Sequence, residues 1–318
     1  MSHGETDIDV LVGDVRAARK YRSVMPEIIR TIGIRELARR ETAAEAKKAT
    51  TRTLHQIAGA YLPGGLQTER WLKTLRSAAP GEFRAACREV MSLHASTQER
   101  LPVLGEFYSI LLGDLPPIRS VLDIGCGLNP LAIPWMPLAE DCVYAACDIY
   151  EDLAVMLCDF FGIVGIRGHA QTQDAVRNAP SDETDVALLL KLLPCLEHIE
   201  CGAGGRLLDA LHARCILISF PVHSLGGRRD KGMGENYERR FLRLTRDRNW
   251  SIERFSFPTE LVFRVQIDRQ PAARLAATAP FAAPVEASSG AMAHAGRRAS
   301  PAPTHGRSQR TNVNSQSG

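Results

Sequence analysis

The stretch VLDIGCGLNP, residues 121–130, decides how the fold is interpreted. Its first half has the composition of a buried strand, and Gly125 and Gly127 follow directly. Glycine has no Cβ, so a turn of this kind lets the backbone approach a bound nucleotide closely. A dinucleotide fingerprint needs a third small residue for helix packing, and Pro130 stands where that residue belongs. The turn therefore disfavours a pyrophosphate cradle and favours a cofactor without phosphate, such as S-adenosylmethionine.

Strand-like runs on both sides of this turn extend the pattern into a sheet. The seven runs are residues 119–125, 142–149, 165–170, 185–193, 214–221, 250–257 and 260–267. Helix-capable segments separate the first five, which are expected to be buried parallel strands. The last two follow each other closely and predict an antiparallel hairpin. The expected fold is α/β, with the Rossmann-like seven-stranded sheet and C-terminal antiparallel hairpin of a class I S-adenosylmethionine-dependent methyltransferase.

The chain before this sheet has a helical pattern and a basic charge. Between residues 14 and 100, apolar residues recur at spacings of three and four between charged ones. Residues 14–52 hold eleven Lys or Arg against five Asp or Glu, in a chain whose net charge is only +3. Charge alone fits a polyanion-facing surface and a solvated helix surface equally. We expect an all-helical, basic, RNA-binding domain over residues 1–115 and a cofactor-binding methyltransferase domain over residues 116–268.

The composition changes again near the C-terminus. Residues 269–318 are rich in Ala, Pro, Ser and Gly, and from residue 271 onward they contain five Arg and one acid, Glu286. No sustained period marks a helix or strand. Such a segment cannot bury enough apolar surface to offset its chain entropy, so a disordered tail is expected.

Several function classes are disfavoured by composition. No apolar run is long enough to span a bilayer, and the N-terminus MSHGETDIDV is acidic and polar where a signal peptide is basic and then apolar. A cytoplasmic protein is therefore expected. The eight cysteines form no CxxC pair, and most lie in apolar runs, so neither a metal site nor a disulfide framework is predicted.

Polar residues at the ends of the predicted strands supply a test of the cofactor. Asp148 closes the second run, 23 residues after Gly125, where a carboxylate would accept the ribose hydroxyls. Asp174 follows the third run and is placed to meet the adenine amine, while Leu190 and Lys191 close the fourth. The alternatives are that Asp148 caps the following helix and that Asp174 is an exposed loop acid. A buried Lys191 would need a partner for its charge.

Longer motifs carry a resemblance to a known family. HASTQERLPVLGEFY (94–108), GCGLNPLAIPWM (125–136), LLLKLLPCLE (188–197) and FPVHSLGGRRDKGMGENY (220–237) resemble the aminoglycoside-resistance 16S rRNA methyltransferases that act on guanine N7. The resemblance covers residues 14–267, and its longer motifs are specific to the family. It implies a small-subunit rRNA substrate, the assembled 30S subunit as partner, and no metal. A monomer is expected.

The resemblance also implies roles for individual residues. Arg100 would bind the carboxylate of S-adenosylmethionine, Gly125 would shape its pocket, and Asp148 and Asp174 would hold its ribose and adenine. Lys191 and Glu197 would flank the target-base pocket. Arg228, Lys231 and Met233 would lie on a loop that engages RNA. The loop GGRRDKGM is one residue longer than the family's usual spacing, so either Arg228 or Arg229 could take the role of its arginine.

The implied chemistry needs no general base, because guanine N7 carries a lone pair and no proton. The scattered histidines of the chain fit this, and catalysis would come from in-line positioning of the reacting atoms. Trp135, beside the glycine turn, could stack on the target base or pack in the core.

Two other functions remain open from the sequence alone. One is a class I methyltransferase that acts on another RNA site or on a small molecule. The other is a noncatalytic RNA-binding protein that keeps a vestigial methyltransferase fold. The intact set of Arg100, Asp148 and Asp174 argues against the second.

Overall fold

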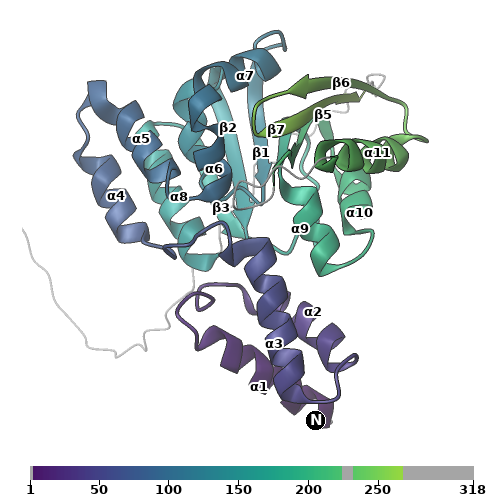
Figure 1. Ribbon diagram of the computed structural model, residues 1–318. Helices are drawn as coiled ribbons and strands as arrows, with labels where there is room; N and C mark the ends of the chain where they lie inside the picture. The colour runs from purple at the N-terminus through teal and green to yellow at the C-terminus, as the bar shows by residue number, and fades with distance from the viewer. Residues whose placement is uncertain (1–2, 224–231, 268–318) are drawn as a thin grey trace, which may run out of the picture. The chain divides into compact units, whose positions relative to one another are not determined.

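A seven-stranded sheet lies at the centre of the protein (Figure 1). The computed structural model describes residues 3–223 and 232–267. The strand order is β3-β2-β1-β4-β5-β7-β6, in which β7 runs antiparallel to both β5 and β6 and the other pairs are parallel. The strands are β1 (Ile118–Ile124), β2 (Leu138–Asp148), β3 (Arg167–Thr172), β4 (Thr184–Leu190), β5 (Ala213–Pro221), β6 (Trp250–Ser256) and β7 (Glu260–Ile267). The predicted class I arrangement is confirmed.

The third strand differs from the expectation of a strand buried on both faces. β3 is an edge strand, paired only with β2, and none of its residues is buried. The reason is its place in the strand order, since an edge strand has a neighbour on one side only. By contrast, Val186 to Leu190 of the interior strand β4 are all buried.

Helices flank the sheet and join its strands. Figure 1 shows α4, α5 and α8 on one side of the view and α9, α10 and α11 on the other. In α4 the buried residues Trp71, Leu72 and Leu75 recur at helical spacing, and α8 ends at Gly165 with φ +75°. These helices are α4 (Thr68–Ser77), α5 (Phe83–Met91), α6 (Ala95–Arg100), α7 (Leu104–Leu112), α8 (Glu151–Val164), α9 (Leu192–Ile199), α10 (Ala203–Ala210) and α11 (Met233–Thr245).

Three further helices form the N-terminal part of the chain and pack on one another: α1 (His3–Arg16), α2 (Pro26–Leu37) and α3 (Ala43–Leu54). Thr42 caps α3 by accepting a hydrogen bond from the Glu45 amide at 3.2 Å. A short π-helix, His55–Gly59, continues α3.

The N-terminal helices contact the sheet part of the same compact unit, which covers Met1–Gln270. Arg35 of α2 donates hydrogen bonds to the carbonyl oxygens of His198 and Ile199 at the end of α9, at 2.9 and 2.5 Å. Val24 forms a β-bridge with Tyr150, just after β2. The division into domains at residues 115 and 116 stays a prediction, and the tail at residues 269–318 lies outside the described residues.

Candidate functional site

The glycine turn after β1 shapes one wall of a cavity at the carboxyl ends of β1, β2 and β4. Gly125 and Gly127 have φ of +62° and +50°, in the left-handed region that favours glycine. A Cβ at Gly125 would lie 2.6 Å from Leu192 Cδ1, and one at Gly127 would lie 2.8 Å from His94 Nε2. Both glycines are therefore required by backbone conformation and by space, as the sequence predicts for Gly125.

Asp148, the last residue of β2, lies beside this turn and lines the cavity. Its Oδ2 accepts a hydrogen bond from Gly127 N–H at 2.8 Å and its Oδ1 accepts one from Ile149 N–H at 2.7 Å. Burial raises its pKa, and these N–H donors oppose the rise. A carboxylate has about four acceptor positions, so Asp148 keeps capacity for two more donors, as a pair of ribose hydroxyls would supply.

Asp174, which follows β3, is buried and also lines the cavity. Its Oδ1 accepts a hydrogen bond from Val176 N–H at 2.9 Å. Its Oδ2 is buried and has no hydrogen-bond partner among the described residues. A buried carboxylate oxygen without a donor is costly, so this atom points to a ligand that brings an N–H or O–H. The alternative of an exposed loop acid is wrong.

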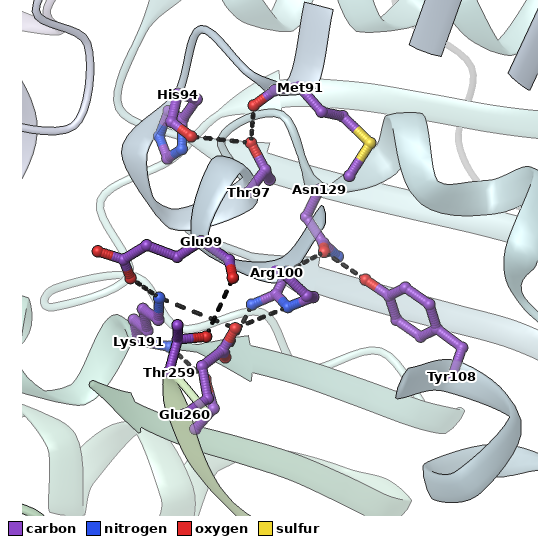
Figure 2. Close-up of polar contacts among 11 residues, drawn as sticks. Met91, His94, Thr97, Glu99, Arg100, Tyr108, Asn129, Lys191, Thr259 and Glu260 are labelled. Atoms are coloured by element: carbon purple, nitrogen blue, oxygen red, sulfur yellow. Dashed lines mark hydrogen bonds and ion pairs between the residues drawn. The ribbon is translucent and has the colours of Figure 1, made fainter. Parts of the chain in front are cut away.

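Arg100, at the end of α6, is 1% exposed and lines the same cavity. Figure 2 shows its guanidinium between two partners. Nε and Nη2 donate to the two carboxylate oxygens of Glu260 at 2.8 and 2.9 Å, and Nη1 donates to Asn129 Oδ1 at 2.8 Å. Guanidinium carries five N–H donors, so one N–H on each terminal nitrogen remains for a ligand. This edge suits a carboxylate.

Lys191 follows β4 and is the one non-glycine residue with positive φ, +59°, in the described part of the chain. Its amide N–H is held by Ser219, with the backbone oxygen at 3.1 Å and Oγ at 3.0 Å. Its ammonium group is 3% exposed, pairs with Glu99 and lies 3.8 Å from Glu260 Oε1. The buried charge thus has the partners that it needs. Leu190, the residue before it, also lines the cavity.

Behind the glycine turn, Asp123 and Asn129 link β1 to Arg100. Asn129 Nδ2 donates to Asp123 Oδ2 at 2.9 Å, and the hydroxyl of Tyr144 donates to the same oxygen at 2.7 Å. Asn129 Oδ1 accepts from Arg100 and from the hydroxyl of Tyr108. Burial raises the pKa of Asp123 to about 6, although these hydrogen bonds oppose the shift. Asp123 and Asn129 of the VLDIGCGLNP stretch therefore help to position Arg100 at the cavity.

The opposite wall comes from the N-terminal helices. Ile28 of α2 and Ile57 of the π-helix line the cavity, together with Tyr61. The ring of Tyr61 stacks on His94, with centroids 5.7 Å apart. Burial lowers the pKa of His94 to about 3, with a contribution from the positive charges of Lys191 and Arg100. His94 is therefore neutral at neutral pH.

Among the described residues, Glu197 and Met233 are predicted site residues that do not line this cavity. Glu197 is exposed and caps α10, accepting hydrogen bonds from the amides of Gly202 and Gly204 at 2.9 and 3.0 Å. Met233 begins α11, and Arg228 and Lys231 lie outside the described residues. Trp135 packs against the core with Arg84 over its ring at 5.5 Å, which supports its packing interpretation.

Sequence reasoning missed Glu260, Glu99, Asn129, Tyr61 and His94. Asn129 and His94 lie within quoted motifs, so their positions were available. Glu260 had no local signal, because it stands in a predicted strand and acts on a residue 160 positions away. In the described ranges, no three His, Cys, Asp or Glu residues gather to hold a metal ion. None of the described helices combines the length and apolar character needed to cross a bilayer.

The cavity can hold a nucleoside with an attached amino acid. Asp174 Oδ2 offers an acceptor for an amine, Asp148 offers acceptors for two hydroxyls, and Arg100 offers two donors for a carboxylate. S-adenosylmethionine carries these groups in this order, so the residues present fit it.

Comparisons with known proteins agree with this chemistry. Residues 17–264 match the sequence model of the family described as ribosomal RNA methyltransferase (FmrO). The chain is 37% identical over 268 residues to a 16S rRNA (guanine(1405)-N(7))-methyltransferase of Micromonospora echinospora, covering 82% of this chain and 97% of the relative. A relative of the same name from Serratia marcescens is 34% identical over 231 residues, covering 73% of this chain and 87% of that protein.

Solved structures give the same result. The crystal structure of the 16S rRNA methyltransferase RmtF in complex with S-adenosyl-L-homocysteine has a TM-score of 0.71 at 31% identity, covering 84% of this chain and 99% of that one. An rRNA methylase from Escherichia coli has a TM-score of 0.67 at 29% identity, covering 82% and 100%. With its fold, its cavity and most of its length matched, the chain belongs to the FmrO family of ribosomal RNA methyltransferases.

Proposed function

We propose that this protein transfers the methyl group of S-adenosylmethionine to N7 of guanine 1405 in 16S rRNA, and that the product ribosome resists aminoglycosides. One observation carries the proposal: a single cavity is lined by Asp148, Asp174, Arg100 and Lys191, in a member of this family. The first pair suits the nucleoside of the cofactor. The second pair would receive its amino acid and face the target base.

The chain's own residues would hold the cofactor at both ends. Asp148 accepts the ribose hydroxyls, and Asp174 Oδ2 accepts the adenine amine. Arg100 donates to the carboxylate, while Gly125 and Leu190 keep the backbone close enough for contact. The cofactor supplies an electrophilic methyl group on a positively charged sulfur. Because both ends of the cofactor are held, its methyl group takes one position relative to Lys191.

The reaction asks no residue to remove a proton, because N7 of guanine has a free lone pair. His94, which is neutral at neutral pH, is therefore not required as a general base. The residues accelerate methyl transfer by holding nucleophile, methyl carbon and sulfur in line. N7 lies on the major-groove edge, so the base must leave its stack to reach the cavity. We assign Lys191 and Met233 to the entrance that receives it, with Arg228 and Lys231 contacting the RNA.

Cations of the N-terminal helices support binding to a large RNA. Of the eleven Lys and Arg in residues 14–52, five form ion pairs with acids. Six have no acidic partner within the described residues: Arg19, Lys20, Arg22, Arg39, Lys48 and Arg52. Cations that are not neutralised within the protein are available to phosphates, which fix the register of a protein on RNA. Glu197 caps α10, so we propose that it supports the target-base pocket through that helix and does not contact the base.

We further propose that the substrate is the assembled 30S subunit and that the enzyme acts as a monomer in the cytoplasm. The N-terminal cations without an acidic partner among the described residues suit a folded ribonucleoprotein, on which several phosphates hold fixed positions. Light scattering after size-exclusion chromatography tests the monomer, for which a mass near 34.9 kDa is expected.

The deciding experiment offers labelled S-adenosylmethionine and the purified protein to intact 30S subunits and, separately, to naked 16S rRNA. Primer extension after cleavage at 7-methylguanine then locates the label. The expected result is label at guanine 1405 in the 30S subunit. If naked rRNA is labelled equally well, the assembled subunit is not required.

Two controls separate failure of substrate from failure of cofactor. Asp148→Asn should lower labelling at a cofactor concentration near the Kd of the normal protein, and Asp141→Asn, an exposed change in the same strand, should preserve it. If both RNAs stay unlabelled while the cofactor binds, the rRNA substrate is wrong and a small-molecule methyltransferase becomes the better interpretation.

A further inference from the structure

The end of the C-terminal hairpin reaches the site from far along the chain. Glu260, the first residue of β7, is 1% exposed and forms a two-point ion pair with Arg100. The preceding residue, Thr259, donates its hydroxyl to the carbonyl oxygen of Glu99 at 3.1 Å. Two successive hairpin residues thus bind two successive residues of α6 (Figure 2).

The backbone around Glu260 is fixed independently of these contacts. Glu260 pairs with Pro221 across the antiparallel β5 and β7 strands, and its carbonyl oxygen accepts from Phe257 N–H at 2.8 Å. The amide of Val222 donates to the carbonyl oxygen of Thr259 at 3.2 Å. The carboxylate therefore comes from a rigid part of the sheet, which makes it suitable for orienting a partner.

Glu260 also links the two cations of the site. Arg100 and Lys191 are both nearly fully buried, and Glu260 lies between them, with Lys191 Nζ at 3.8 Å. Glu99 pairs with Lys191 from the other side but is 28% exposed. Without Glu260, Arg100 would lose its only carboxylate ion-pair partner among the described residues, and Lys191 would keep only the partly exposed Glu99, in a cavity that receives a positively charged sulfur. Both cations would then move or bind water.

Glu260 itself is not among the residues that line the cavity. We propose that Glu260 is a positioning residue of the methyl transfer reaction, which orients Arg100 toward the cofactor carboxylate and keeps Lys191 at the target-base side. The proposal rests on the proposed function, since it takes S-adenosylmethionine as the ligand of Arg100. It assigns to the C-terminal hairpin a part in cofactor binding.

The geometry of the guanidinium explains how this works. With Nε and one N–H of Nη2 on Glu260, and one N–H of Nη1 on Asn129, the plane and rotation of the group are fixed. One N–H on each of Nη1 and Nη2 has no carboxylate or amide partner among these contacts. A carboxylate that binds these two N–H groups needs no rearrangement of Arg100, so less ordering entropy is lost on binding.

The test is the variant Glu260→Gln, which keeps the size of the side chain and removes its charge. Calorimetry compares binding of S-adenosylmethionine with binding of 5′-methylthioadenosine, which has the nucleoside but no amino acid. We expect affinity for S-adenosylmethionine to fall about 10-fold to 100-fold and affinity for 5′-methylthioadenosine to change less than about 2-fold. Equal losses for both ligands would indicate general damage and overturn the proposal.

The matched control is Glu253→Gln in β6 of the same hairpin. Glu253 also forms a two-point ion pair with an arginine, Arg264, but is 45% exposed and does not line the cavity. It should leave both affinities unchanged. If Glu260→Gln fails to fold, Glu260→Asp keeps the charge and shortens the reach, and the same selective loss, smaller in size, is expected.

These measurements are independent of the RNA substrate. If the normal protein binds cofactor but leaves guanine 1405 unlabelled, the proposed function fails while the role of Glu260 in binding can still be judged. If Glu260→Gln binds S-adenosylmethionine as well as the normal protein does, the positioning role is wrong and the proposed function is untouched. Lys191 adds a second readout, since the labelling rate at saturating cofactor should also fall in Glu260→Gln.

Discussion

The two ends of the cavity are held in different ways. At the nucleoside end, Asp148 and Asp174 are fixed by amide groups of Gly127, Ile149 and Val176, which lie in or beside the same strand ends. At the charged end, side chains hold the cations: Glu260 of β7 pairs with Arg100, and Lys191 pairs with Glu99 and lies 3.8 Å from Glu260. The first end depends on local backbone geometry and the second on charge pairing between distant segments.

This difference predicts different responses to change. A carboxylate that is held by neighbouring backbone amides keeps its position when a distant residue is replaced. It loses that position when the backbone of the adjacent turn changes. A buried pair of ions tolerates small backbone shifts but not the loss of one partner, because the other charge is then left uncompensated.

The largest effect on labelling is expected from Gly127→Ala, which changes the backbone at the nucleoside end. The residue has φ +50°, and the new Cβ would lie 2.8 Å from His94 Nε2. We expect labelling of the 30S subunit to fall ~100-fold or more, since a misplaced turn displaces Asp148 as well. Unfolding in urea should show a loss of ~1–3 kcal/mol.

Gly162→Ala is the matched control for that change. Gly162 is an exposed residue of α8 with open space around its Cβ position. Alanine there should stabilise the helix by ~0.5–1 kcal/mol and leave labelling unchanged. If Gly127→Ala were tolerated equally well, the dependence of the nucleoside end on its turn would be wrong.

A smaller loss is expected from Asp148→Asn, which leaves the turn but removes the charge. Hydrogen bonds to a charged acceptor contribute ~1.5–3 kcal/mol each, so the Kd for S-adenosylmethionine should rise ~10-fold to 100-fold. Unlike Glu260→Gln, this variant should weaken 5′-methylthioadenosine equally, because both ligands carry the ribose. Calorimetry with the two ligands measures this, and a selective loss for S-adenosylmethionine alone would contradict the assignment of Asp148 to the ribose.

Asp123 connects the two ends, and its titration gives a pH-dependent prediction. Its pKa in the folded protein is raised from 3.8 to about 6, mainly by burial. Between these values the folded state binds more protons than the unfolded state, so this group makes stability fall as pH rises from ~4 to ~6. A shift of this size corresponds to ~3 kcal/mol at most.

Asp123→Asn should remove that fall. Urea unfolding of both proteins at a series of pH values between 4 and 7 measures it. We expect the variant to gain stability relative to the normal protein as pH rises through this window. Parallel curves would mean that Asp123 has the same pKa in the folded and unfolded protein, with its hydrogen bonds to Asn129 and Tyr144 offsetting its burial.

The smallest effect is expected on the free energy of unfolding, when an arginine near the surface is replaced. Arg35→Ala removes two hydrogen bonds that join α2 to the end of α9, and should cost ~0.5–1.5 kcal/mol of stability. Arg39→Ala removes an exposed arginine of the same region and should cost less than ~0.5 kcal/mol. Thermal unfolding compares them, and equal melting temperatures would show that the tether contributes nothing.

The same contrast explains what could be predicted from the sequence. Gly125, Asp148 and Asp174 follow strand ends, and the rule that ligands bind at the carboxyl ends of parallel strands placed all three in one cavity. The seven strands and the terminal hairpin followed from the spacing of apolar runs, whereas the strand order was read from the structure. β3 was expected to be buried because periodicity cannot tell an edge strand from an interior one.

The charged end resisted prediction for a physical reason. An ion pair across 160 residues leaves no spacing in the sequence, so the partner of Arg100 could be found only in the folded chain. Glu197 was placed at the target base from its position in the LLLKLLPCLE motif, and that role stays a prediction. The structure adds that its carboxylate caps α10, which the motif did not indicate.

The place of β7 in the sheet has a consequence for biosynthesis. Proteins are made from the N-terminus, and the glycine turn, Asp148 and Asp174 are all translated well before residue 260. A nascent chain can therefore assemble the nucleoside end first, while Arg100 still lacks its acid. Only when β7 enters between β5 and β6 does the charged end close. A chain that lacked that strand would have the nucleoside end of the pocket without the acid that pairs with Arg100, so full cofactor binding requires translation beyond residue 260.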